Sequence, residues 1–112
     1  MNEKKKPFVI VESPYRGKDV NSNIAYARAA VRDCIDRNEL PFASHLLYTQ
    51  VGVLNDDVAS ERNLGIGLNL EMIQRADLVA AYVDHGLSTG MISALHYAQT
   101  QNVKIQFRKL YE

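Results

Sequence analysis

The chain has 112 residues, of which 46% are apolar and 23% charged. This composition is typical of one ordinary globular domain, so we expect residues 1–112 to form a single domain. Thirteen basic residues balance thirteen acidic ones. Because such a chain has no net positive field, the balance argues against nucleic acid and anionic membranes as partners and favours a small molecule.

The cysteine content and the hydropathy pattern indicate where the protein is located and what type of protein it is. Cys34 is the only cysteine and belongs to an apolar stretch with helical spacing, so we expect it to pack in the core. The absence of a second cysteine rules out a disulfide within the chain and favours a cytoplasmic location. We expect neither a membrane span nor a signal peptide. The sequence shows no metal-ligand spacing and implies no cofactor.

The first half of the chain opens with a strand and a helix. Residues 8–11 form a continuous apolar run rich in β-branched side chains, which predicts a buried strand. Turn-forming residues follow over positions 13–17. Residues 24–35 carry apolar side chains at helical spacing, with residues 21–23 as candidate N-caps. Residues 40–43 predict a weak strand, which Pro41 restricts to a strand start or a sheet edge.

The second half of the chain predicts a loop, two helices and two strands. Residues 44–60 predict a long loop with one helical turn, and residues 61–75 predict a helix with a broad apolar face. Residues 78–83 predict a second buried strand that ends in a glycine-bearing loop. A helix over 91–101 and an alternating strand over 103–107 complete the pattern. The fold class is therefore α/β: a small flavodoxin- or Rossmann-like three-layer domain with a mostly parallel sheet of four or five strands.

Ligands of open parallel sheets bind beyond the carboxyl ends of the strands, so the loops after the two strongest strands are the expected site. Both loops carry suitable chemistry for a phosphate. A hydroxyl group or a guanidinium can bind an anion, and so can the free N–H groups at a helix N-terminus. The expected phosphate-binding residues are Ser13, Pro14, Arg16 and Gly17 in the first loop and Ser88, Thr89, Gly90 and Met91 in the second.

Three segments of the chain resemble one known family. ADLVAAYVD, LSTG and ALHYA, which end at Ala98, look like the signature of the nucleoside 2-deoxyribosyltransferase-like superfamily. This superfamily includes deoxynucleoside 5′-monophosphate N-glycosidases and short phage and bacterial proteins. The opening FVIVESPYRG is similar to the family's first strand and loop, and residues 41–46, which contain His45, resemble a segment of its short members.

The resemblance implies a protein that cleaves the N-glycosidic bond of a nucleoside 5′-monophosphate or a related nucleotide. In this family a glutamate early in the last helix attacks the anomeric carbon, because an oxocarbenium-like transition state needs a carboxylate beside it. The corresponding position holds Ala94. A methyl group cannot act as a nucleophile, so the chain as written is expected to be inactive.

Three explanations of Ala94 remain open. In the first, the glutamate was replaced to trap a ligand. In the second, the protein is a non-enzymatic binder that sequesters a signalling nucleotide. In the third, the alignment of the last helix with the family is out of register and another acid is the nucleophile. The nearby acids are Glu12, Asp57, Asp77 and Asp84. Of these, Asp84 directly follows a strand and is expected to reach a ligand, whereas Asp77 enters a strand and is expected to be structural.

The remaining candidates are aromatic and imidazole side chains. Tyr15 is expected to contact the sugar, and His45 or His85 to donate to a base or a sugar, since a neutral imidazole is a versatile hydrogen-bonding group. His96 is expected to be a helix-face residue. Related small members assemble, so we also expect a homo-oligomer, a dimer or larger, in which a neighbouring chain helps to close the site.

Overall fold

The computed structural model describes residues 5–17 and 19–111. Within these residues four parallel strands form one sheet, in the spatial order β2-β1-β3-β4. The strands are β1 (Phe8–Glu12), β2 (Leu40–Phe42), β3 (Leu78–Tyr82) and β4 (Lys104–Arg108). The helices are α1 (Val20–Asp36), α2 (Ser44–Leu47), α3 (Ala59–Gln74) and α4 (Thr89–Thr100). The expected α/β fold with a parallel sheet is confirmed.

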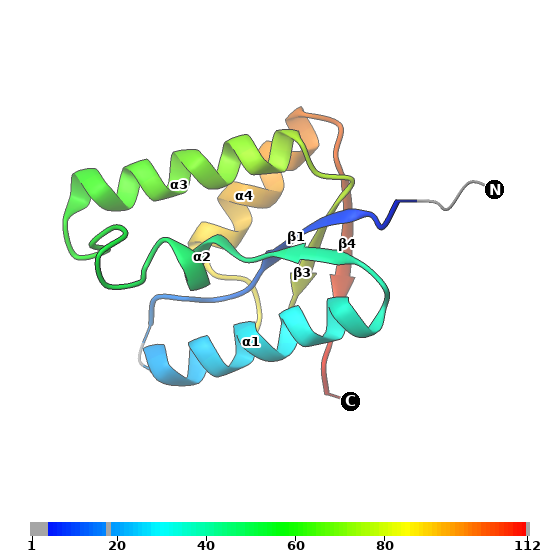
Figure 1. Cartoon of the computed structure of the whole chain (residues 1–112), viewed down its shortest axis with the longest axis horizontal. Helices are drawn as coiled ribbons and strands as arrows, with labels where there is room; N and C mark the ends of the chain where they lie inside the picture. Colours follow the sequence, from blue (N-terminus) through cyan, green and yellow to red (C-terminus); the bar gives the residue numbers. More distant parts are fainter. Residues whose placement is uncertain (1–4, 18, 112) are drawn as a thin grey trace.

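The sheet lies between two helical layers, with α1 on one face and α3 and α4 on the other (Figure 1). Alternation along the strands divides the core accordingly. Val9 and Val11 pack with Tyr26 and Ala30 of α1. Ile10, between those two valines, packs in the second cluster with residues of α3 and α4. Both faces of the central strands are covered, which explains why β1 and β3 are continuous apolar runs.

The chain changes direction across the sheet between β1 and β3. From β1 it passes through α1 to β2 on one side, and β3 then pairs with β1 on the other side. The loops that leave the carboxyl ends of β1 and β3 therefore separate toward opposite layers. Such a switch point leaves a crevice beyond the strand ends, where open α/β sheets bind ligands.

The expectation for Pro41 is confirmed. β2 is an edge strand of the sheet and pairs only with β1, with Pro41 opposite Val9. An edge position accommodates proline because no further strand requires its missing N–H group.

Other details of the elements differ from the sequence interpretation. α1 begins at Val20, because Asp19 caps it by accepting a hydrogen bond from the Ser22 backbone N–H at 3.0 Å; the predicted caps at residues 21–23 lie inside the helix. The alternation of β4 fails at its end: Phe107 is 60% exposed and Arg108 is buried. The physical reason is an acidic partner for Arg108: Glu39, which lies far away in the sequence and whose side chain is only 10% exposed.

The predicted broad apolar face of α3 is only partly covered. Asn69 and Ile73 are its buried residues, whereas Leu64 and Ile66 are about half exposed. Figure 1 shows the reason, since the amino-terminal part of α3 extends beyond the sheet. Cys34 is fully buried, as expected of a packing residue. No helix of the described residues is long and apolar enough to cross a membrane.

Candidate nucleotide site

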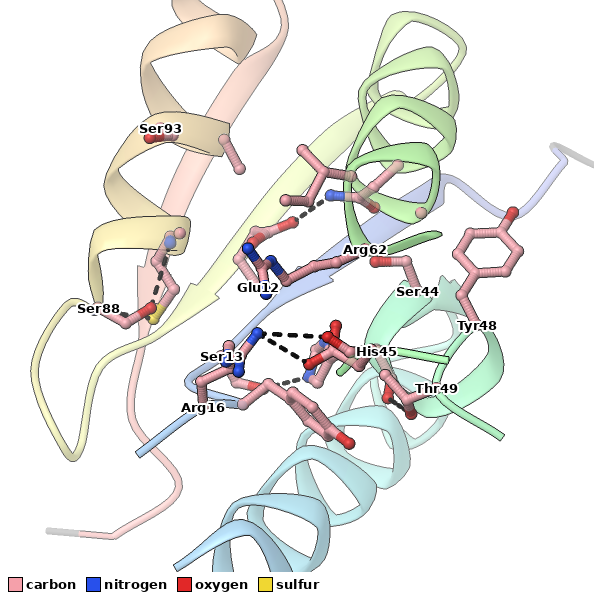
Figure 2. A pocket seen from close by; sticks show the side chains of 18 of the residues that line it. Glu12, Ser13, Arg16, Ser44, His45, Tyr48, Thr49, Arg62, Ser88 and Ser93 are labelled. Carbon is pink, nitrogen blue, oxygen red and sulfur yellow. Dashed lines mark hydrogen bonds and ion pairs between the residues drawn. The ribbon is translucent and has the colours of Figure 1, made fainter. Parts of the chain in front are cut away.

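A cavity of about 790 Å³ opens at the carboxyl ends of β1 and β3. Its walls come from the loop after β1, from α2 and the loop that follows it, from one side of α3 and from the first turns of α4 (Figure 2). This volume is in the range of small-molecule sites, and the position is the switch point of the sheet. Among the predicted residues, those that line the cavity are Ser13, Tyr15, Arg16, His45, Ser88, Thr89, Gly90, Met91 and Ala94.

Four predicted site residues lie outside this lining, and one of them is His85, whose ring centre is 4.5 Å from that of Tyr26. Pro14 is buried next to it, and Gly17 borders an adjacent hollow that also contains Asp57. Asp84 has a different environment: its carboxylate accepts hydrogen bonds from the Tyr26 hydroxyl and from the backbone N–H groups of Leu110 and Tyr111. Desolvation raises the pKa of Asp84, but these hydrogen bonds outweigh it and hold the pKa at about 2. Asp84 thus fastens the end of the chain to α1.

Ser13 and His45 form a polar pair inside the cavity. The Ser13 hydroxyl and His45 Nε2 are 2.8 Å apart, and the Tyr15 ring meets the imidazole edge-on. Burial lowers the pKa of His45 to about 4, so the imidazole is neutral near pH 7. A general base works best with a pKa near the working pH, so this imidazole is a poor activator of the serine. It is better suited to hydrogen bonding a neutral ligand group.

The amino terminus of α4 forms the opposite wall. Ser88 caps the helix, its Oγ accepting from the Met91 N–H at 3.2 Å. The N–H groups of Thr89 and Gly90 precede the first intrahelical hydrogen bond and have no partner within the helix. A Cβ added at Gly90 would meet no atom within 4 Å, so the space beside it is open. Free N–H groups and the helix dipole make this end of the cavity an anion-binding position.

Two arginines line the cavity. Arg16 forms an ion pair with Asp56 at 3.4 Å, and its side chain is 55% exposed. Arg62, which sequence reasoning missed, extends from α3 into the cavity (Figure 2). No ion pair of Arg62 is found within residues 5–17 and 19–111. No sequence signal singled out Arg62, because its approach to the site depends on how α3 packs.

Of the four acids named in the sequence analysis, only Glu12 lines the cavity, together with Asp56 and Glu61. Glu12 is the last residue of β1 and is buried. The Asn69 amide on α3 donates a hydrogen bond to its Oε2 at 2.9 Å. Desolvation raises the pKa of Glu12 to about 7, although the hydrogen bond from Asn69 partly lowers it. The signal in the sequence is a carboxylate at the end of an otherwise apolar strand.

The comparisons with solved structures define the class of fold. A 2-deoxyribosyltransferase from Bacillus psychrosaccharolyticus aligns with a TM-score of 0.66 and 16% identity over 91% of this chain and 72% of that chain. A 2-deoxyribosyltransferase from Leishmania mexicana aligns with a TM-score of 0.60 and 15% identity over 94% and 65%. The chain therefore has the nucleoside 2-deoxyribosyltransferase-like fold, as the resemblance in its sequence implied.

The sequence family of the chain is a narrower group than the proteins that share its fold. Residues 7–108 match the sequence profile of a domain of unknown function, DUF7768. The chain belongs to this family. No curated protein matches the sequence.

Proposed function

We propose that the chain binds a nucleoside 5′-monophosphate or a related nucleotide in this cavity and acts on its N-glycosidic bond. The observation that carries the proposal is the combination of an anion-binding helix terminus and a neutral polar pair in one cavity at the switch point of the sheet. The phosphate lies at Ser88–Gly90, and we assign Arg62 and Arg16 on the cavity wall as its cationic contacts. The sugar lies near Tyr15, and Ser13 and His45 hydrogen bond neutral groups of the ligand.

The structural neighbours support this proposal through what their names state. Both are 2-deoxyribosyltransferases and have the same fold. A deoxyribosyl transfer breaks a bond at the anomeric carbon, which is the chemistry proposed for this site.

A binder without turnover is the second candidate, and one observation favours it. Ala94 lines the cavity at the position that the family resemblance assigns to the nucleophile, and it presents only a methyl group. The two candidates differ in one result. Saturating nucleotide releases free base with time if the chain is an enzyme, and stays intact if the chain is a binder.

A charge at the α4 terminus tests the binding itself. Gly90→Asp places a carboxylate beside the expected phosphate, and Gly90→Asn is its neutral control of equal size. Neither side chain meets a protein atom at its Cβ. We expect calorimetry to show at least about a tenfold loss of monophosphate affinity in the Asp variant relative to the Asn variant, since charge-assisted contacts contribute about 1.5–3 kcal/mol. Equal affinities would place the phosphate elsewhere.

A further inference from the structure

Glu12 and Ala94 line the same cavity from two different elements. Side chains two residues apart on a strand share a face, so Glu12 lies on the same side of the sheet as Ile10. Ile10 and Ala94 belong to one core cluster, between the sheet and α4. The hydrogen bond to Asn69 places the Glu12 carboxyl against α3 on this same side. Glu12 therefore extends from the sheet into the part of the cavity that Ala94 borders.

The surroundings of Glu12 are unusual for a structural carboxylate. Another glutamate of this chain, Glu39, shows the structural pattern: Arg108 binds both of its oxygens, at 2.8 and 2.6 Å. Glu12 has only the amide of Asn69 on Oε2, and within the described residues no basic side chain pairs with it. Its second oxygen, Oε1, accepts no hydrogen bond within those residues. A buried carboxyl with one open oxygen in a cavity is typical of a reactive group.

We propose that Glu12 supplies the catalytic carboxylate of this chain, in place of a side chain at position 94. This inference rests on the proposed function, since it requires a nucleotide in the cavity. Oε1 of Glu12 attacks the anomeric carbon, and the C–N bond to the base breaks with its electron pair passing to the base nitrogen, which takes a proton from water. Water then attacks the anomeric carbon of the glycosyl ester, releasing the sugar phosphate and restoring the carboxylate.

The small side chain at position 94 fits this arrangement. A glutamate there would bring a second carboxylate into the cavity that holds Glu12, and like charges at one site oppose each other's ionisation. The Ala94 methyl instead leaves the space beside Glu12 to the sugar. Ala94→Glu is therefore expected to lower base release in this chain, contrary to what the family resemblance alone would suggest.

The nucleophile is the ionised form, so base release should rise with pH. Burial holds the pKa of Glu12 at about 7, which places the rise near neutral pH. The other titratable or charged groups on the cavity wall are His45 and Tyr48 in and after α2, Glu61 and Arg62 of α3, and Tyr15, Arg16 and Asp56 in loops; α4 contributes none. The pKa of His45 is about 4, well below this range.

The test compares Glu12→Gln with the parent chain, and uses Glu71→Gln on the exposed surface of α3 as the control. A panel of deoxynucleoside and ribonucleoside 5′-monophosphates is scored for base release by chromatography and for binding by thermal shift. We expect the parent and Glu71→Gln to release base with a rise near pH 7. Glu12→Gln should keep the thermal shift and lose at least about 100-fold in rate, because an amide cannot attack the anomeric carbon as a carboxylate does.

Other outcomes separate this inference from the proposed function. If the parent chain binds a monophosphate but releases no base, or if Glu12→Gln releases base as fast as the parent, Glu12 is not the nucleophile while nucleotide binding stands. If base release appears only in Ala94→Glu, and equally with Glu12→Ala added, position 94 is the nucleophile position. If no monophosphate shifts the melting temperature, the proposed function itself fails.

Discussion

Glu12 is buried and the Glu39 side chain is only 10% exposed, yet the two carboxylates have very different hydrogen-bond partners. Two hydrogen bonds from Arg108 replace the water that the Glu39 carboxylate loses. Glu12 has one amide donor in exchange for its hydration. A desolvated carboxylate without a counter-charge destabilises the folded state once it ionises. Residues of this kind are retained where function requires them, at a cost in stability.

This cost gives a testable dependence of stability on pH. The pKa of Glu12 is about 7 in the folded chain against 4.5 for an ordinary glutamate, so the folded state binds the proton more tightly. Its stability contribution is therefore fully present below pH 4.5 and is lost as the pH rises through 7. We expect Glu12→Gln to remove this loss. The variant should be more stable than the parent at pH 8 by up to about 3 kcal/mol, because a pKa difference of one between the folded and unfolded states corresponds to about 1.4 kcal/mol.

Urea unfolding of both proteins at pH 5 and pH 8 measures the effect. Glu71→Gln is the matched control, because it makes the same chemical change on an exposed face. A difference between Glu12→Gln and the parent that is the same at both pH values would contradict the raised pKa.

The hydrogen bond from Asn69 limits the rise in the pKa of Glu12 that burial causes. The Asn69 amide donates to the carboxylate and so lowers the pKa, opposing the desolvation. Asn69→Ala removes the donor, so we expect the midpoint of the pH–rate curve for base release to move upward. Nucleotide affinity at low pH should change little. A midpoint that stays in place or moves down would show that the rise with pH does not report Glu12.

Arg16 and Arg62 are expected to bind the phosphate of the nucleotide. Arg16→Ala and Arg62→Ala should each weaken a monophosphate more than its bare nucleoside, by about tenfold or more for a charge-assisted contact. The effect should be larger for Arg62, because Arg16 already has Asp56 as a partner that a phosphate must displace. Calorimetry with both ligands measures this, and equal weakening of the two ligands would exclude a phosphate contact.

At the scale of elements, local patterns determine the central strands but not the last one. β1 and β3 are covered on both faces, so their continuous apolar runs identify them without knowledge of their neighbours. β4 is an edge strand whose last residue, Arg108, points into the protein toward Glu39. The partner is 69 residues away in the sequence, so alternation over residues 103–107 misplaced Phe107 and gave no sign that Arg108 is buried.

The same limit applies to the site. The loops after β1 and β3 could be placed together because parallel strands end at one edge of a sheet, and the structure does bring Ser13 and Ser88 to one cavity. The sequence could not rank Glu12 above Asp84, since both lie at strand ends. That choice depends on contacts that only the fold creates. Asn69 donates a hydrogen bond to Glu12, whereas the N–H groups of Leu110 and Tyr111 donate hydrogen bonds to the Asp84 carboxylate.

The ion pair between Glu39 and Arg108 should be important for the packing of the sheet against α1. The Arg108 side chain is 3% exposed and also donates to the Tyr82 hydroxyl. Glu39→Gln leaves this guanidinium buried without its counter-charge, so we expect a loss of about 3 kcal/mol or more in the free energy of unfolding. The exposed pair of Arg32 and Asp36 is the control, and Asp36→Asn should cost under about 0.5 kcal/mol.

At the scale of the whole molecule, we expect self-association through α3 and α4. Leu64, Ile66 and Ile92 are each more than half exposed on these helices. Exposed apolar side chains on neighbouring helices are typical of an interface. Light scattering should report a dimer or a larger assembly, and Leu64→Glu should weaken it. Val51→Glu is the control, because Val51 is fully exposed in the loop between α2 and α3 and belongs to neither α3 nor α4. A monomer at high concentration would contradict the expectation.

The connectivity of the strands also has a consequence for the folding rate. All strand pairings are parallel, and each needs an intervening crossover before it can form. Arg108 must reach Glu39 across 69 residues, and the N–H groups of Leu110 and Tyr111 must reach Asp84. Non-local contacts of this kind slow folding, because the chain loses conformational entropy in closing the loop before the contacts stabilise it. During synthesis the core would therefore stay open until β4 leaves the ribosome, and a nascent chain stalled before that point would be an easy substrate for proteases.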